Sequence, residues 1–302
     1  PAKSDFHYHN IGNPALLQKA DWMYYRRHVR GNDRSFRINA FFNGYSGKRP
    51  VLNYHAKIPV LPKSYKRAYP FKLGTTSFIY PDNYLPNVKM LGPYLDEIEL
   101  LLFESAYDSL PSKQEIKDLS MLAKEFDITY DIHLPLDIYL GDKNPTIRRR
   151  AIDTIKQVID LTLPLSPSIF TLHFSYDEDS SDKDIVNKWQ ERIYESMDKL
   201  LSTGIKSRSI AIENLMYPFE WVEEVIFSLN LSACIDTGHL ILMNAEIKET
   251  FDKYCNRTSI IHLHGVKNNL DHLSLDKLTD NETSDIMKIL KGYAGVVIIQ
   301  DL

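Results

Sequence analysis

The 302-residue sequence has only two cysteines, Cys234 and Cys255, and neither is part of a C-x-x-C pair. This scarcity excludes a disulfide-stabilised secreted domain, so we expect reduced thiols in a cytoplasmic protein. No apolar run approaches the ~18 residues of a membrane-spanning helix, and the N-terminal residues lack the apolar stretch of a secretory signal. The P-loop and G-x-S-x-G motifs are also missing. We therefore expect neither a P-loop nucleotide site nor a catalytic serine on a G-x-S-x-G turn.

Acidic residues are scarce in the first part of the chain, and basic residues are outnumbered in the rest, although the net charge is only −4. Residues 1–69 contain 13 Lys+Arg and 3 Asp, whereas residues 70–302 contain 23 Lys+Arg and 37 Asp+Glu. A basic segment of this kind can bind nucleic acid or another anionic ligand. Because the segment is also rich in aromatic residues, we favour the interpretation that it packs across the acidic remainder, without a nucleic-acid partner.

From residue 70 onward, short apolar runs alternate with amphipathic helical stretches. Eight strands are predicted, over residues 73–79, 97–103, 128–134, 169–174, 209–213, 231–236, 259–264 and 295–300. The clearest helix follows Asn144, a predicted N-cap, with Pro145 in the first helical position. This alternation predicts a (β/α)8 TIM barrel over residues 70–302. A doubly wound sheet is the alternative, but no glycine-rich phosphate loop follows the first strand.

Residues 1–69 form a basic, aromatic leader with one clear helical pattern, over residues 14–30. Asn13 is its predicted N-cap and Pro14 its first residue, while residues 32–69 are predicted to be extended. No helical stretch follows the eighth predicted strand, although a (β/α)8 barrel has a helix in that place. We therefore predict that the leader helix packs there, on the outside of the barrel.

Polar residues stand where the predicted strands end, and in such barrels the active site lies at the C-terminal ends of the strands. In chain order they are His133, His173, Glu213, Asp236, His239, His262, His264, Asp271, His272 and Gln300. All six histidines outside the leader belong to this set. His262 and His264 alternate along one strand, so their side chains are expected to point the same way.

Imidazole and carboxylate groups are the ligands that zinc and its first-row neighbours prefer. A barrel mouth with so many of them can hold two or three ions. Two ions about 4 Å apart can contact both the attacking and the leaving oxygen of a phosphoester. We therefore predict a divalent metal cofactor, zinc first, with manganese or iron as alternatives. The competing interpretation is a set of independent structural histidines.

The runs Glu213-Asn214, Asp236-x-Gly238-His239 and His262-Leu263 resemble the xylose-isomerase-like barrels, the superfamily of the type-2 abasic-site endonucleases. The resemblance covers residues 72–300 and implies a three-metal centre. The implied ligands are His133, His173, the bridging Glu213, Asp236 with His239, His262, Asp271 with His272, and Gln300. The family has a glutamate at the last position, so Gln300 is a departure that supplies an uncharged and poorer ligand.

Four other runs, Leu73–Pro81, Ile98–Ser105, His133–Asp137 and Asp271–Leu275, resemble the cobamide-remodelling hydrolases of the same superfamily. Those enzymes open the nucleotide loop of vitamin B12-like cofactors at the phosphoribosyl linkage, so the resemblance implies a corrinoid substrate. Contacts to this ligand are assigned to Ser77, Glu104 and Lys267. Glu104 can instead cap the next helix, and Lys267 can be a solvated loop residue.

These features together predict a metal-dependent phosphodiester hydrolase acting on cobamides. Glu213 and Asp236 are its predicted catalytic carboxylates, and His264 either orients a neighbour or protonates the leaving group. Three alternatives are kept. A sugar isomerase or epimerase needs one metal and a pair of glutamates, an abasic-site endonuclease is favoured by the basic leader, and an inactive corrinoid-binding protein is favoured by Gln300 alone.

Overall fold

The computed structural model describes residues 61–79, 82–178 and 180–300. These residues belong to one compact unit. The predicted leader helix over 14–30, with its place on the barrel, lies outside the described residues, and the division of the chain at residue 70 stays a prediction. No helix in the described part is long and apolar enough to cross a membrane.

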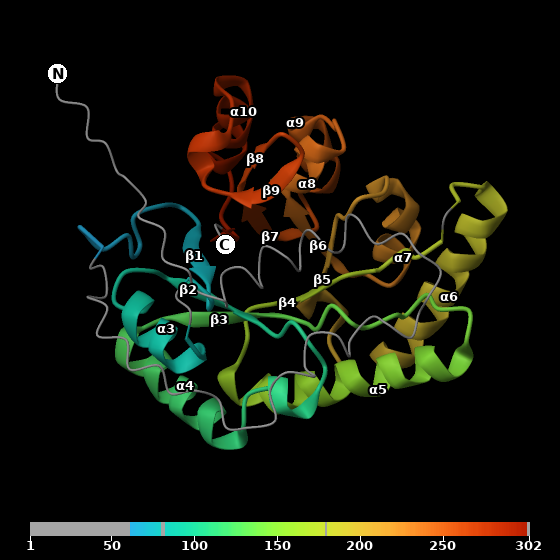
Figure 1. Cartoon of the computed structure of the whole chain (residues 1–302), viewed down its shortest axis with the longest axis horizontal. Helices are drawn as coiled ribbons and strands as arrows, with labels where there is room; N and C mark the ends of the chain where they lie inside the picture. The colour runs from blue at the N-terminus through green and yellow to red at the C-terminus, as the bar shows by residue number, and fades with distance from the viewer. Residues whose placement is uncertain (1–60, 80–81, 179, 301–302) are drawn as a thin grey trace. The chain divides into compact units, whose positions relative to one another are not determined.

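Eight parallel strands close into a barrel, in the order β1-β10-β7-β6-β5-β4-β3-β2 (Figure 1). Their bounds are β1 Lys72–Thr76, β2 Glu97–Leu101, β3 Thr129–His133, β4 Phe170–Leu172, β5 Ile210–Glu213, β6 Ser232–Asp236, β7 Thr258–Leu263 and β10 Val296–Ile299. Each corresponds to one predicted run, so the (β/α)8 barrel is confirmed. Parallel strands buried on both faces favour these nearly continuous apolar runs.

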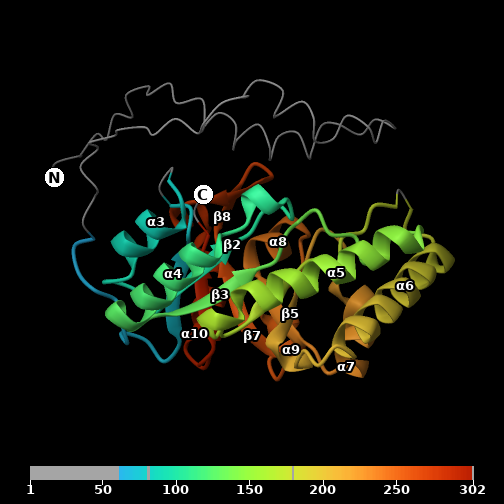
Figure 2. The same cartoon turned by 90° about the horizontal axis from the view of Figure 1, so that it is seen from below.

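Helices surround the barrel, and the space between strands and helices holds the larger hydrophobic core. Their bounds are α3 Tyr84–Leu91, α4 Lys113–Phe126, α5 Pro145–Thr162, α6 Lys183–Leu201, α7 Glu223–Ser228, α8 Thr237–Leu242, α9 Ile247–Tyr254 and α10 Asp280–Leu290. The side chain of Asn144 accepts from the N–H of Thr146, which confirms the predicted cap of α5. Helices α5 and α6 lie side by side in both views (Figure 2).

A small antiparallel hairpin was not foreseen between the seventh and eighth barrel strands. It consists of β8 (Gly265–Lys267) and β9 (Leu270–Leu273), joined by Asn268 and Asn269. Both asparagines have positive φ angles, 52° and 61°, which a two-residue type I′ turn requires. The hairpin takes the chain away from the end of β7 and back towards the mouth of the barrel.

The inside of the barrel differs between its two halves. Side chains of β5, β6, β7 and β10, with one from the residue before β4, form a small apolar cluster there, consisting of Ile169, Ala211, Cys234, Ile260, Val296 and Ile298. The half formed by β1 to β3 carries charge instead, because Glu97 and Glu99 of β2 stand in register with Thr129 and Asp131 of β3. Glu97, Glu99 and Asp131 are all fully buried. The polar half of the interior continues into the polar residues at the C-terminal ends of the strands.

Candidate metal centre

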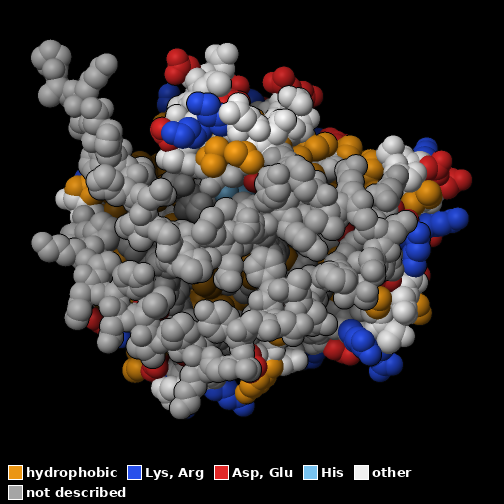
Figure 3. Space-filling view, viewed as in Figure 1, with side chains coloured by type: hydrophobic (Ala, Val, Ile, Leu, Met, Phe, Trp, Pro, Cys, Tyr) orange, Lys and Arg blue, Asp and Glu red, His pale blue; other side chains and the backbone are white. Residues whose placement is uncertain are grey.

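The C-terminal ends of the strands bring the predicted ligands and His264 together from six positions around the barrel. His133 ends β3, His173 follows β4, Glu213 ends β5, Asp236 ends β6, His239 lies in α8, His262 lies in β7, His264 follows it, Asp271 and His272 lie in β9, and Gln300 follows β10. All are buried except Asp271 and His272, which are partly exposed. Every histidine among residues 61–300 belongs to this set, so the histidine surface visible in Figure 3 belongs to the centre.

Glu213 lies between two histidines on one side of the centre. Its Oε2 is 3.2 Å from Nε2 of His133 and 2.9 Å from Nε2 of His173. The Nδ1 of His133 lies 3.0 Å from the carbonyl oxygen of Leu134, so Nδ1 carries the proton and Nε2 presents its lone pair. An imidazole nitrogen this close to a carboxylate oxygen needs a proton or a metal ion between them. These three residues are therefore suited to bind one divalent ion.

The charge state of Glu213 fits the same role. Burial alone raises the pKa of its carboxyl group, but the nearby imidazoles of His173 and His262 outweigh burial and hold that pKa well below its usual value. The carboxylate is therefore ionised at neutral pH. Its second oxygen, Oε1, is 3.4 Å from Nδ1 of His239, so one carboxylate faces both sides of the centre.

His239 is positioned by the start of α8. Asp236 is the N-cap of this helix, and its Oδ1 accepts from the backbone N–H of His239 at 2.8 Å. The Nδ1 of His239 is 2.9 Å from the carbonyl oxygen of Asn214, which leaves Nε2 as the nitrogen with a free lone pair. Asn214 also accepts from the Asp236 N–H at 2.7 Å. The Glu-Asn and Asp-x-x-His pairs are thus held together by one amide side chain.

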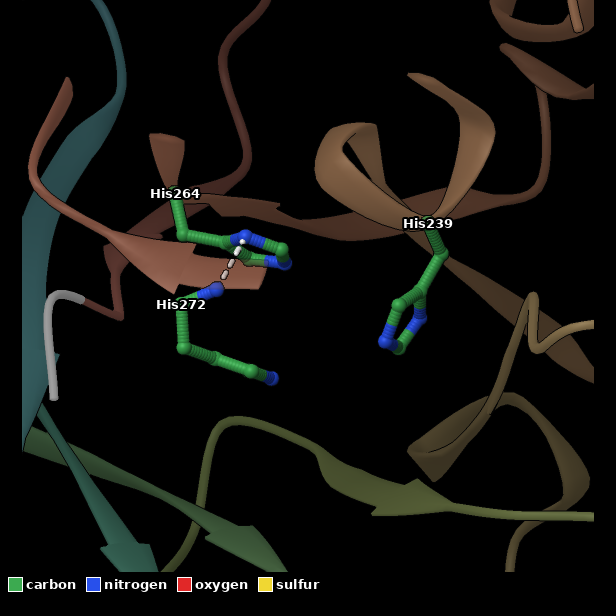
Figure 4. Close-up of side chains that lie close together, drawn as sticks. All are labelled: His239, His264 and His272. Atoms are coloured by element: carbon green, nitrogen blue, oxygen red, sulfur yellow. Dashed lines mark hydrogen bonds between the residues drawn. The ribbon is translucent and has the colours of Figure 1, made fainter. Parts of the chain in front are cut away.

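A second group of imidazoles consists of His239, His264 and His272 (Figure 4). One nitrogen from each ring lies within 4.8 Å of the others. The Nδ1 of His264 accepts from the backbone N–H of His272 at 2.9 Å, and its Nε2 is 3.1 Å from Oδ2 of Asp236. Both nitrogens of His264 are therefore engaged, and this ring orients Asp236. Burial, followed by the charge of His264, lowers the pKa of His272 to about 4, so His272 is neutral and able to bind a metal.

Gly238 explains why His264 can lie so close to α8. A Cβ atom at this position would overlap the His264 ring. The glycine of the Asp-x-Gly-His run therefore provides the space for an imidazole that arrives from β7. The sequence contained this glycine, but only the packing shows its purpose.

His262 is fully buried and faces two polar side chains that the sequence did not single out together. Its Nε2 is 3.0 Å from Oε1 of Glu99, and its Nδ1 is 3.0 Å from Nε2 of Gln300. Glu99 was missed as a residue of this centre because it lies inside a strand rather than at its end. The sequence did contain a sign of its role. Glu99 is a carboxylate two residues from Glu97 in a strand predicted to be buried, where an unpaired charge is costly.

Three residues predicted to contact the substrate lie away from these groups or at their edge. Ser77 is fully buried, and its hydroxyl accepts from the Leu101 N–H at 3.2 Å, which joins the ends of β1 and β2. Glu104 is partly buried and accepts from the Ser109 hydroxyl at 3.2 Å. Lys267 is exposed at the end of β8, on the hairpin that also carries His272.

The donor set fits divalent metal ions. Imidazole nitrogens and buried carboxylates converge on the mouth, and backbone carbonyls lie within hydrogen-bond distance of Nδ1 of His133 and His239. Such outer partners are the usual support of histidines that bind metals. The buried histidine and glutamate groups therefore form a candidate metal centre. A set of independent structural histidines would not explain why these groups converge.

Comparisons with known proteins agree with this arrangement. The model of the xylose isomerase-like TIM barrel family matches residues 88–300. An uncharacterised protein of Methanocaldococcus jannaschii is 27% identical over 194 residues, which are 59% of this chain and 72% of that protein.

Solved structures share the barrel at low sequence identity. A D-tagatose 3-epimerase-like protein is 20% identical with a TM-score of 0.64, and the match covers 76% of this chain and 91% of that one. Endonuclease IV from Thermus thermophilus is 16% identical with a TM-score of 0.57 and the same coverage. A 3-keto-D-glucoside 4-epimerase from E. coli is 12% identical, again with a TM-score of 0.57 and the same coverage. These likenesses show the fold, and the family match over most of the barrel shows that the chain belongs to the xylose isomerase-like TIM barrel family.

Proposed function

We propose that this protein is a metal-dependent phosphodiester hydrolase, and that its substrate is the nucleotide loop of a cobamide. The observation that carries the reaction type is the position of Glu213 between two groups of imidazoles, with Oε2 towards His133 and His173 and Oε1 towards His239. Divalent ions bound there would lower the pKa of a water molecule and neutralise charge on phosphoryl oxygens.

The protein side chains supply the orientation for that chemistry. Glu213 stays ionised and addresses both sides of the centre. Asp236 is held by three partners, because its Oδ1 accepts from the N–H of His239, its oxygens lie 3.0 and 3.1 Å from Nε2 of His264, and its backbone pairs with Asn214. His264 can therefore place the Asp236 carboxylate, and Lys267 on the neighbouring hairpin is available to an anionic group of the substrate.

The substrate class rests on the resemblance of the runs around Ile98–Ser105 and Asp271–Leu275 to the cobamide-remodelling hydrolases. A corrinoid with its nucleotide loop also carries the phosphodiester that this donor set is suited to cleave. The proposal therefore joins a reaction type taken from the metal centre to a substrate taken from the sequence.

The test uses the full chain loaded with zinc and incubated with a cobamide, followed by mass spectrometry of the products. The expected products are a corrinoid of the cobinamide-phosphate type, which keeps the phosphate, and the released riboside. Glu213→Gln is expected to reduce kcat/KM about 100-fold or more, equivalent to ~2.7 kcal/mol of transition-state stabilisation. The exposed Glu125→Gln variant is the matched control and should retain activity. Intact cobamide after incubation with protein of verified metal content would contradict the proposal.

A sugar epimerase is the second candidate, because Glu213, Asp236 and His239 also lie close enough together to hold a single ion. Epimerisation needs an acid–base group on each side of the reacting carbon. Gln300 has no such function, and its amide is directed at Glu99 and His262. The candidate is tested by following D-tagatose and D-fructose by NMR with the same zinc-loaded protein. Inversion at carbon 3 would favour the epimerase over the hydrolase.

A further inference from the structure

We propose that Gln300 is not a metal ligand but a clamp that withdraws His262 from metal binding, so that one of the three metal positions implied by the endonuclease resemblance is closed in this chain. The inference rests on the metal centre proposed above, and it concerns the number of ions rather than the reaction.

The clamp is a contact of three buried side chains. The Nε2 of Gln300 is 2.8 Å from Oε2 of Glu99 and 3.0 Å from Nδ1 of His262. On the other side of the imidazole, Nε2 of His262 is 3.0 Å from Oε1 of Glu99. Glu99 and His262 are fully buried and Gln300 is 3% exposed, so no bulk water competes for these groups.

The orientation of the Gln300 amide follows from its neighbours. Turning the amide over would place its carbonyl oxygen against Oε2 of Glu99, where two acceptors would repel each other. The NH2 group therefore faces Glu99, and the same NH2 group donates to Nδ1 of His262. A lone pair that accepts this hydrogen bond is not free to bind a metal ion, while the other ring nitrogen of His262 faces Glu99.

The remaining donors at this position are weak ones. Besides His262, Glu213 and Cys234 are close enough to contribute. Cys234 is fully buried and belongs to the small apolar cluster inside the barrel. With His262 engaged by Gln300 and Glu99, the main donor left there is Glu213, whose Oε2 already faces His133 and His173. By contrast, His133, His173 and Glu213 offer three, and the group around His239 and His272 has its own donors.

The neutral amide of Gln300 also suits the carboxylate of Glu99. A glutamate at position 300 would face the Glu99 carboxylate across the same 2.8 Å contact, and two buried carboxylates at that distance repel strongly unless a cation lies between them. A metal ion would supply that cation. The Gln300→Glu variant is therefore expected to reopen the third position, with Glu213 and His262 as further ligands.

The test counts zinc ions per folded chain by native mass spectrometry, with elemental analysis as a check. Gln300→Glu is expected to bind one more ion than the unmodified protein. Gln114→Glu, which makes the same change at an exposed position of α4, is the matched control and should bind the same number as the unmodified protein. An unchanged count in folded Gln300→Glu would overturn the inference.

A second comparison decides the question even if Gln300→Glu does not fold. His262→Asn is expected to keep the full zinc count, whereas His133→Asn should lose one ion, because only His133 is a ligand. Loss of an ion from both variants would overturn the inference. Neither comparison uses a substrate, so a failure of the proposed hydrolysis would be recognised separately, by intact cobamide with a normal zinc count.

Discussion

At the scale of single residues, Gly238 is the most constrained position of the centre. Replacing it with alanine would push a Cβ atom into the His264 ring. We expect Gly238→Ala to lower the free energy of unfolding by roughly 1–3 kcal/mol, as overpacked sites do, and to weaken zinc binding because His264 no longer orients Asp236. Urea unfolding and zinc titration measure the two effects.

The control for this prediction is Gly292→Ala. A Cβ atom at Gly292 would have no atom within 4 Å, so this variant should differ from the unmodified protein by less than about 0.5 kcal/mol. Equal stability and zinc affinity in Gly238→Ala and the unmodified protein would contradict the assigned role of the glycine.

Asp131 supports a prediction about pH. Its carboxyl group is fully buried beside Glu99, and burial, followed by the charges of Glu99 and Glu97, raises its pKa well above the usual value. The folded protein therefore keeps a proton that the unfolded chain releases as the pH rises above about 4. Through this group, stability falls with rising pH until the folded-state pKa is passed.

Asp131→Asn removes this linkage, because the amide is neutral at every pH and can donate to Glu99. The variant should gain thermal stability relative to the unmodified protein at pH 8, and the gain should shrink at pH 5. Melting curves at the two pH values measure it. A gain that is equal at both, or a loss at pH 8, would be inconsistent with a protonated Asp131.

Residue identity alone could not reveal these details. The sequence placed His133, His239 and His262 at the ends of strands because the barrel rule applies to every strand. It could not state which ring nitrogen faces the centre, since the backbone carbonyls of Leu134 and Asn214 decide that. Nor could it show that Gln300 faces Glu99, a residue from the far end of the chain.

At the scale of secondary-structure elements, the β8–β9 hairpin determines where His272 lies. Its turn needs left-handed backbone at Asn268 and Asn269, and His272 itself has a φ of 51°. Alanine tolerates this conformation poorly, at a cost of roughly 1–2 kcal/mol per residue. Replacing both asparagines with alanine should therefore weaken zinc binding about 10-fold, equivalent to ~1.4 kcal/mol.

Asn230→Ala is the control for the hairpin. Asn230 also has a positive φ, 53°, but it follows α7 and does not contact the centre. It should lose some stability and keep its zinc affinity, as measured by calorimetric titration. If the double variant bound zinc as tightly as Asn230→Ala, the hairpin would not be what positions His272.

The barrel strands were predictable and the hairpin was not, for a physical reason. Each barrel strand is an apolar run, and the predicted runs end up to three residues past the observed strands, as with 97–103 against Glu97–Leu101. Some backbone hydrogen bonds continue there, as from the Leu102 N–H to the carbonyl oxygen of His133. The hairpin strands have three and four residues, mostly polar or exposed, so no hydrophobic pattern marks them.

At the scale of the whole molecule, metal removal should destabilise the fold. The ligands that remain come from the ends of four neighbouring strands, β3 to β6, and from α8 and β9, so bound ions link these elements at the barrel mouth. A ligand present at 1,000 times its Kd stabilises the folded state by about 4 kcal/mol. Chelation should therefore lower the Tm, and added zinc should restore it. An unchanged Tm after verified metal loss would contradict a linking role for the ions.

The pairing that closes the barrel joins the first strand to the last. Lys72 to Thr75 stand in register with Val296 to Ile299, so the two partners are separated by more than 220 residues, as the Thr75–Ile299 hydrogen bond shows. At about 5–20 residues per second, a ribosome needs roughly 10–45 s to make the intervening chain. During that time β1 has one partner strand, and Gln300 does not yet exist. The complete centre therefore forms only after residue 300 has been made.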